Sequence, residues 1–116
     1  MSITYTRTYK RTTTDAPWYE RSGHKASLVA DWVTAGKMTA TLLRPDPLIR
    51  IVIRTYASKA LYDEWVALPA HQLSLTLQSI HDTANGITWT SVKTDSSTGT
   101  SITDNSANYS LNLSTS

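Results

Sequence analysis

Leu48-Ile-Arg-Ile-Val-Ile-Arg-Thr-Tyr56 has the strongest strand character in this 116-residue chain. Its β-branched and aromatic side chains fit a pleated strand better than a helix. After this segment, Ser58 can cap the free N–H groups of a helix that runs through Lys59-Ala-Leu-Tyr-Asp-Glu-Trp-Val-Ala-Leu68. The middle of the chain therefore predicts a strand that leads directly into a helix.

Alternation marks an earlier strand at the start of the chain. In residues 1–14, Ile3, Tyr5, Arg7 and Tyr9 alternate with threonines and a lysine, and a period of two predicts a strand. Tyrosine and arginine gather on one side of this strand and threonine on the other. Until a partner strand is known, either side can face inward.

A helix and a second strand lie between these two strands. Asp15-Ala-Pro17 ends the first strand, because proline keeps the preceding residue extended and suits the first turn of a helix. Apolar residues at helical spacing predict a helix within residues 18–35, with Gly36 in the left-handed position after it. Residues 37–44 predict the second strand, and Pro45-Asp46-Pro47 turns it back into the central strand.

A further helical segment and a fourth strand follow the central unit. Leu68-Pro69 predicts a kink or a restart of the helix. Beyond it, one apolar stripe at helical spacing is formed by Leu73, Leu77, Ile80 and Ala84. Asn85-Gly86 is a helix stop, and residues 87–93 predict the fourth strand.

This order of elements predicts an α+β domain over residues 1–95. Two βαβ units in tandem interleave most simply as a ferredoxin-like βαββαβ sandwich, a four-stranded antiparallel sheet with two helices on one face. In that arrangement the first and third strands are central, and one face of the sheet is bare. We expect the bare face to present a mixture of tyrosine, arginine and valine, drawn from Tyr5, Arg7, Tyr9, Arg50, Val52, Arg54 and Tyr56.

Residues 96–116 are expected to form an extended C-terminal arm. The segment is rich in serine, threonine and asparagine, so it buries too little apolar area to offset an ordering cost of roughly 1–2 kcal/mol per residue. Within it, Tyr109, Leu111 and Leu113 alternate with polar residues, as in a strand that lies on an apolar surface or adds to a sheet edge. We expect the arm to be held by its own domain or by a neighbouring copy.

The composition excludes several classes of protein. A hydrophobic fraction of 40% and a charged fraction of 17% fit one globular domain, and the absence of cysteine removes disulfides, thiolate metal sites and thiol nucleophiles. The sequence contains neither an apolar run of membrane-spanning length nor a secretory signal, so we expect a cytoplasmic origin. A net charge of +2 is too small to indicate nucleic acid by itself.

No pattern in the sequence indicates catalysis, a cofactor or a metal. His24, His71 and His81 lack the i, i+4 spacing of metal ligands on one helix, and no nucleophile elbow, phosphate loop or dinucleotide loop is present. A serine or threonine could still pair with a histidine in space. The tryptophans could suggest a ligand pocket, but Trp32 and Trp65 lie on predicted apolar helix faces, which favours core packing. We therefore predict no catalytic, cofactor or metal residues, and no enzyme.

The tyrosine and arginine side of the sheet is the clearest candidate for a binding surface. Aromatic and arginine side chains bind RNA on sheets of this topology, but residues 48–56 lack the Gly-aromatic-Gly/Ala-Phe run of that family. The same residue types are enriched where proteins meet. We predict a protein interface made by Tyr5, Arg7, Tyr9, Arg50, Arg54 and Tyr56 on the sheet and by Tyr109, Leu111 and Leu113 on the arm.

Two segments resemble known families. Thr4-Tyr-Thr-Arg-Thr-Tyr9, followed by Thr14-Asp-Ala-Pro-Trp-Tyr19, is similar to the start of small virion structural proteins of tailed bacteriophages, which implies a role in assembly without catalysis. Ser58-Lys-Ala-Leu-Tyr-Asp-Glu-Trp65 and the strand before it are similar to dimeric α+β barrel proteins, including small monooxygenases and related stress proteins. Those proteins pair their open sheets around a pocket, into which this sequence aims no clear histidine or acid.

The expected function is that of a noncatalytic building block of a bacteriophage virion, associated with the capsid or the tail and assembled in the host cytoplasm. Its partners would be other virion proteins or copies of itself in a homo-oligomer, bound through the open sheet face and the arm. The first alternative is a homodimeric α+β barrel enzyme or small-ligand binder. The second is a nucleic-acid-binding sheet, against which the missing RNA motif argues. No cofactor and no membrane contact are expected.

Overall fold

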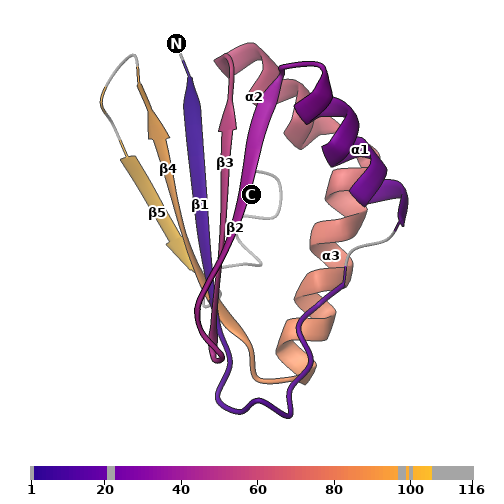
Figure 1. Cartoon of the computed structure of the whole chain (residues 1–116), viewed down its shortest axis with the longest axis vertical. Coiled ribbons are helices and arrows are strands. Elements are labelled where there is room, and N and C mark those ends of the chain that lie inside the picture. Colours follow the sequence, from indigo (N-terminus) through magenta and orange to yellow (C-terminus); the bar gives the residue numbers. More distant parts are fainter. Residues whose placement is uncertain (1, 21–22, 97–98, 100, 106–116) are drawn as a thin grey trace.

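The chain folds into an α+β domain in which three helices lie on one face of an open, five-stranded antiparallel sheet (Figure 1). The computed structural model describes residues 2–20, 23–96, 99 and 101–105. The elements follow in the order β1 (Ile3–Lys10), α1 (Gly23–Thr34), β2 (Met38–Asp46), β3 (Ile49–Tyr56), α2 (Lys59–Ala67), α3 (Pro69–Ala84), β4 (Thr88–Asp95) and β5 (Ser101–Asn105). The predicted α+β class is confirmed.

The strand order is β2-β3-β1-β4-β5, and every neighbouring pair is antiparallel. The sheet has five strands where four were predicted, and there are three helices where two were predicted, because Pro69 starts α3 directly after α2. The additional strand comes from the predicted arm, since β5 pairs with β4 from Thr94↔Ser101 to Thr90↔Asn105. This part of the arm therefore belongs to the domain's own sheet.

Short-range signals place the helix ends. The Ser58 hydroxyl accepts a hydrogen bond from the Leu61 N–H at 3.2 Å and caps α2, as predicted. Pro69 occupies the first turn of α3. Backbone N–H groups in the first turn have no carbonyl acceptor within the helix, so the missing N–H of proline costs no hydrogen bond there. Gly36 and Gly86 follow α1 and α3 with φ of 75° and 67°, a region that glycine enters without steric penalty.

In the two inner strands, β1 and β3, the side chains point to the opposite side of the sheet from the one predicted. The register pairs Ile3 with Tyr56, and both are buried in the main core against the helices. Because side chains alternate across a strand, every second residue of β1 and β3 follows them to the helix side. The placement of the tyrosine and arginine set on the bare face was therefore wrong, and the residues that lie inside instead are Tyr5, Arg7, Tyr9, Arg50, Val52, Arg54 and Tyr56.

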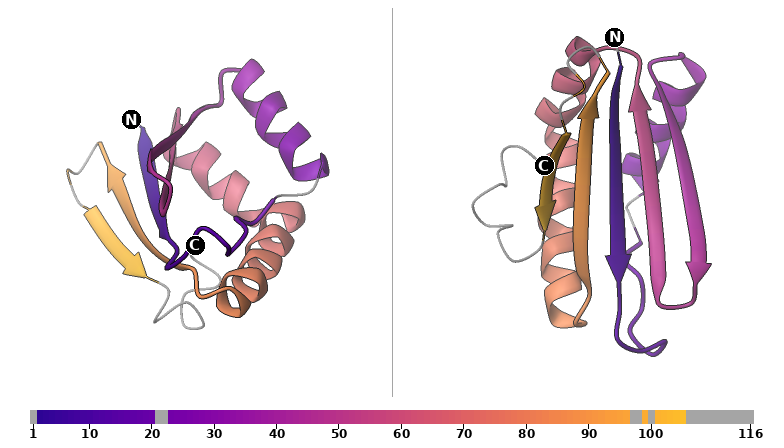
Figure 2. Two further views of the ribbon diagram at one scale, coloured as in Figure 1. Left: turned by 60° about the horizontal axis from the view of Figure 1, so that its bottom comes forward. Right: turned by 90° about the vertical axis from the view of Figure 1, so that its left-hand side faces the viewer.

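The outer face of the sheet carries mostly β-branched residues. On β1 it presents Thr4, Thr6 and Thr8, and the register places Ile51 and Ile53 of β3 beside them. No helix of the described chain covers this face, which looks toward the viewer in the right-hand panel of Figure 2. A bare sheet face was predicted, and the structure differs from the prediction in the residue types that this face carries.

The main core closes one end of the layer between the sheet and the helices. Its buried members are Ile3, Val29, Trp32, Met38, Tyr56, Tyr62 and Trp65. Trp65 is fully buried and meets Trp32 edge to face, with 4.9 Å between the ring centroids. Trp32 and Trp65 are thus core residues, as the sequence predicted, and the pocket described next begins where this cluster ends.

Candidate functional site

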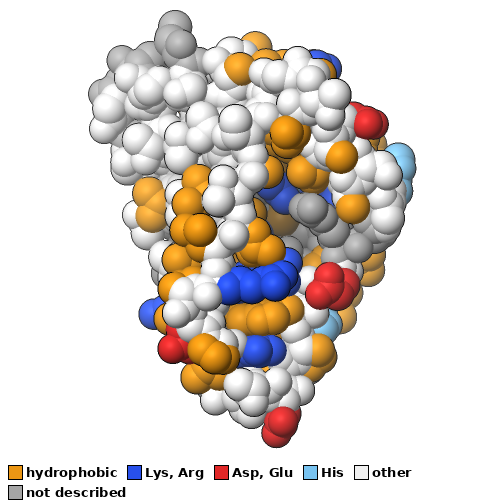
Figure 3. All heavy atoms as spheres, in the orientation of Figure 1, with side chains coloured by type: hydrophobic (Ala, Val, Ile, Leu, Met, Phe, Trp, Pro, Cys, Tyr) orange, Lys and Arg blue, Asp and Glu red, His pale blue; other side chains and the backbone are white. Residues whose placement is uncertain are grey.

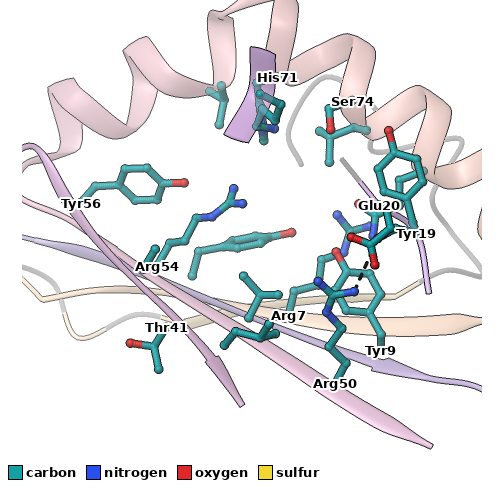
Figure 4. Close-up of a pocket in the computed structure, with 18 of the residues that line it drawn as sticks. Arg7, Tyr9, Tyr19, Glu20, Thr41, Arg50, Arg54, Tyr56, His71 and Ser74 are labelled. Atoms are coloured by element: carbon teal, nitrogen blue, oxygen red, sulfur yellow. Dashed lines mark hydrogen bonds between the residues drawn. The ribbon is translucent and has the colours of Figure 1, made fainter. Parts of the chain in front are cut away.

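A cavity of about 310 Å³ lies between the sheet and the helices, beside the main core. Strands β1, β2 and β3 form one wall, and residues of α1, α2 and α3 with Tyr19 and Glu20 form the other (Figure 4). In the space-filling view, Lys and Arg side chains are visible where the surface is hollowed between the two layers (Figure 3). The volume is in the range of small-molecule sites, about 300–1,000 Å³.

Arginine and tyrosine alternate on the sheet wall of this cavity. Tyr5 stands opposite Arg54, Tyr9 stands opposite Arg50, and Arg7 lies on the rung between these pairs. Each of the three arginines has a buried Nε without a hydrogen-bond partner among the described residues. None of them forms an ion pair with a carboxylate in the described part of the chain. Arg50 Nη1 donates a 3.5 Å hydrogen bond to the Tyr19 carbonyl oxygen, and the Nε–H groups of all three arginines are left as unused donors on permanently charged side chains.

Arg7 is the most enclosed of the three arginines, with 4% of its surface exposed. Its guanidinium carbon lies 3.9 Å from the ring centroid of Trp89 and 5.3 Å from that of Tyr9. Stacking on aromatic rings makes the burial of a guanidinium less unfavourable, because the cation is delocalised and weakly hydrated. Burial raises the pKa of the Tyr9 hydroxyl, and the Arg7 charge partly lowers it. The rings hold Arg7 in place but leave its Nε unpaired.

A second basic group lies at the end of the cavity next to the main core. The Arg54 guanidinium carbon and the Lys25 Nζ lie 5.6 and 5.3 Å from the Trp65 ring centroid. Lys25 Nζ and His71 Nδ1 are joined by a buried 2.8 Å hydrogen bond. An ammonium group has donors only, so with Lys25 charged the Nδ1 atom is the acceptor and the imidazole carries its proton on Nε2.

The helix wall of the cavity is formed by the polar face of α3. His71 and Ser74 are buried on this face together with Leu75, and Gln78 lies one turn further along. The opposite, exposed face carries the apolar stripe, with exposed fractions of 59% for Leu73, 44% for Leu77 and 64% for Ile80. An amphipathic helix usually turns its apolar stripe to the core. In α3 the apolar stripe faces outward and the polar face points inward, because the inner side borders a polar cavity.

Asp82 continues the polar face of α3 beyond the cavity lining. The residue is 4% exposed, and its Oδ2 has no hydrogen-bond partner among the described residues. Burial raises the pKa of this carboxyl to about 6, while the charges of His81, Arg7 and Arg50 lower it. The carboxylate thus lies within electrostatic reach of two cavity arginines without forming a direct bond to either.

The structure gathers six of the predicted interface residues into one place. Tyr5, Arg7, Tyr9, Arg50, Arg54 and Tyr56 all line the cavity, and the other three, Tyr109, Leu111 and Leu113, lie outside the described residues. Sequence reasoning missed the contributions of Lys25, Glu20 and the inner face of α3. One signal was present, because the polar residues of α3 recur at helical spacing opposite the apolar stripe, at His71, Ser74, Gln78 and Asp82.

The described residues contain no cluster of three or more His, Asp or Glu side chains that could hold a metal ion. Within the same part of the chain, no helix has the length and apolar character needed to cross a membrane. Comparison of the chain with models of protein families, with curated proteins and with solved structures gives no match.

Proposed function

We propose that this domain binds a small anionic ligand in the cavity between its sheet and its helices. The observation that carries the proposal is the buried Arg7, which is a lining residue of the cavity and whose Nε has no hydrogen-bond partner among the described residues. A buried polar donor without a partner costs about 1–3 kcal/mol, and more when it is charged. An anionic ligand in the cavity would supply the missing acceptor.

The charge and shape of the wall support an anion in preference to a neutral ligand. Arginine remains protonated at any physiological pH, and its planar fork matches the two oxygens of a carboxylate or a phosphate. Arg50 and Arg54 share one property with Arg7, since the buried Nε of each has no hydrogen-bond acceptor among the described residues. Among the lining residues the single carboxylate is Glu20. The cavity therefore has more positive charge than its own acids compensate.

Isothermal titration of the purified chain with pyrophosphate and with citrate, at constant ionic strength, tests the proposal. Arg7→Gln removes the enclosed guanidinium and is expected to weaken binding roughly 10- to 100-fold, the value of a charged hydrogen bond of about 1.5–3 kcal/mol. Arg44→Gln is the matched control, because Arg44 is an exposed arginine outside the cavity. Arg54→Gln gives a second variant if Arg7→Gln unfolds. Absence of anion binding by the unmodified chain would contradict the proposal.

The sheet order also supports a ferredoxin-like arrangement as the scaffold of this site. Strands β2, β3, β1 and β4 follow one another across the sheet, and the segments between β1 and β2 and between β3 and β4 are helical. That connectivity is the one of a split βαβ unit used twice. We propose that β5 is an addition at the β4 edge of this scaffold.

Assembly into a larger particle, such as a bacteriophage virion, is a second candidate function. Two observations favour it: no described helix covers the outer face of the sheet, and α3 turns Leu73, Leu77 and Ile80 to the outside. Exposed apolar stripes of this kind mark contacts with other proteins. Both surfaces lie away from the cavity, so assembly and ligand binding are compatible.

Size-exclusion chromatography with light scattering tests the assembly candidate. The full chain is expected to form an oligomer, and Leu77→Lys is expected to reduce it to a monomer because a charge interrupts the apolar stripe. Thr83→Lys adds the same charge at an exposed position of α3 outside the stripe and should leave the mass unchanged. A chain that ends after Asn105 retains β5 and tests the predicted contacts of Tyr109, Leu111 and Leu113. A monomeric full chain would count against assembly of the protein with itself.

A further inference from the structure

The basic residues of the cavity form two groups at its two ends. Arg54 lies with Lys25 beside Trp65, next to the main core. Arg7 lies over Trp89, which belongs to the smaller buried cluster with Tyr9 and Ile87. Figure 4 shows Arg54 on the side of Tyr56 and His71, and Arg50 on the side of Tyr9, Tyr19 and Glu20. The two groups are therefore separated along the strands.

The backbone sets the scale of this separation. Arg50 and Arg54 are on the same strand and face the same side. Four residues of an antiparallel strand span about 13 Å at roughly 3.3 Å per residue. Arg7 stands level with Val52, halfway between them, but its guanidinium carbon lies 3.9 Å from the ring centroid of Trp89, and Trp89 is the strand partner of Tyr9, which stands opposite Arg50. Arg7 and Arg50 thus belong to one end and Arg54 to the other.

The cavity has basic side chains at both ends and few carboxylates near them. The basic side chains Arg7, Arg50, Arg54 and Lys25 line the cavity, and the carboxylates in reach of them are Glu20 in the lining and Asp82 behind it. None of the three arginines forms an ion pair with either carboxylate in the described part of the chain, so each end keeps a guanidinium without a bonded acid. A ligand with one anionic group would neutralise one end only.

The middle of the sheet wall has a different character. Between the arginines lies Val52, whose partner on the next strand is Leu42, and both line the cavity. On the opposite side, Leu75 contributes an apolar side chain from α3. These three side chains offer contacts for a short apolar or planar linker, while Arg7, whose backbone is level with Val52, places its guanidinium over Trp89.

We infer that the ligand is an elongated dianion, with one anionic group held by Arg54 and the other by Arg7 and Arg50, joined by a short apolar or planar linker. The inference rests on the proposed anion-binding function and adds to it the number and placement of the acidic groups. Carboxylate and phosphate are equivalent for the guanidinium fork, so the geometry assigns the dianionic character and leaves the acid to the experiment.

Calorimetric titration with straight-chain α,ω-dicarboxylates of four to nine carbons, beside monocarboxylates of the same lengths, tests the inference. A dicarboxylate of optimal length is expected to bind at least about tenfold more tightly than its monocarboxylate, since it makes a second charged contact. Arg54→Gln should reduce the dicarboxylate affinity to that of the monocarboxylate, whereas the exposed-arginine control Arg44→Gln should change neither. Bisphosphonates of the same lengths show whether phosphate-type groups bind better than carboxylates.

The outcomes separate this inference from the proposed function. Equal affinities for the monoacids and diacids, in a chain that binds both, would overturn the dianion and leave anion binding intact. Failure of every acid in both series, together with pyrophosphate and citrate, would overturn both. A length optimum that disappears in Arg54→Gln and also in Arg50→Gln would support the two-ended arrangement.

Discussion

The layer between the sheet and the helices has two halves of opposite character. At the Trp65 end, Ile3, Trp32 and Met38 fill the space with close-packed apolar groups. Along the same strands, the positions that follow carry arginine and tyrosine, and the layer opens into a cavity of about 310 Å³. The first half stabilises the domain, and the second retains charges that oppose its stability. The proposed anion binding would account for this loss of stability.

The helix α3 repeats this contrast across its own axis. Its inner face presents His71, Ser74 and Gln78 to the cavity, and its outer face presents Leu77 and Ile80 to the surroundings. The reversal follows from the contents of the layer, because a polar cavity is better bordered by groups that can form hydrogen bonds than by leucine.

Truncation of the apolar half is expected to have the largest effect. Trp65→Ala removes a fully buried ring that contacts Trp32 and Tyr56, and we expect a loss of about 3–5 kcal/mol in the free energy of unfolding. Urea unfolding followed by circular dichroism measures it. Trp18→Ala, at a partly buried tryptophan outside the main core, is the comparison and should cost clearly less. Equal losses in the two variants would mean that the Trp65 end is not the stabilising half.

Removal of a buried charge from the polar half should raise the free energy of unfolding, whereas Trp65→Ala lowers it. Burial raises the pKa of Asp82 to about 6 in the folded chain, above the ordinary value of 3.8. The folded state therefore holds the proton more tightly than the unfolded state, so the free energy of unfolding falls as the pH rises from about 4 to about 6 and then levels off. Asp82→Asn should abolish this fall and stabilise the chain at pH 7 by on the order of 1–3 kcal/mol.

Urea unfolding at pH 4, 5, 6 and 7 measures the effect of Asp82→Asn. Asp31→Asn, on the exposed side of α1, is the matched control and should retain the pH dependence of the unmodified chain. A profile of Asp82→Asn that still falls between pH 4 and pH 6 would show that another group causes the fall.

The smallest change in stability is expected when an arginine of the polar half is replaced by an apolar residue of similar length. In Arg7→Met the stacking on Trp89 is kept in part and the unpaired Nε disappears, so we expect a net change within about 1 kcal/mol, of either sign. Anion binding should be weakened in the same variant, as in Arg7→Gln. A large destabilisation would mean that Arg7 is a structural residue of the core, which would remove the contrast between the halves.

Local patterns in the sequence were sufficient for most of the secondary structure. The period of two in β1 and β3, the Ser58 cap and the glycines after α1 and α3 each act over a few residues, so they can be recognised without knowledge of the fold. The fifth strand was missed because the composition of residues 96–116 resembles that of an unfolded segment, and its pairing with β4 is a contact with the sheet edge.

The residues of the candidate site were recognisable as one set, but their location was not. Alternation places Tyr5, Arg7 and Tyr9 on one side of β1, and nothing in that pattern distinguishes the inner side from the outer one. The decision comes from distant contacts, since Ile3 and its partner Tyr56 pack against Trp65 and thereby turn every second residue of both strands toward the helices. Identity and spacing of side chains are properties of the chain, whereas the inward direction of the arginines exists only once the helices have packed on the sheet.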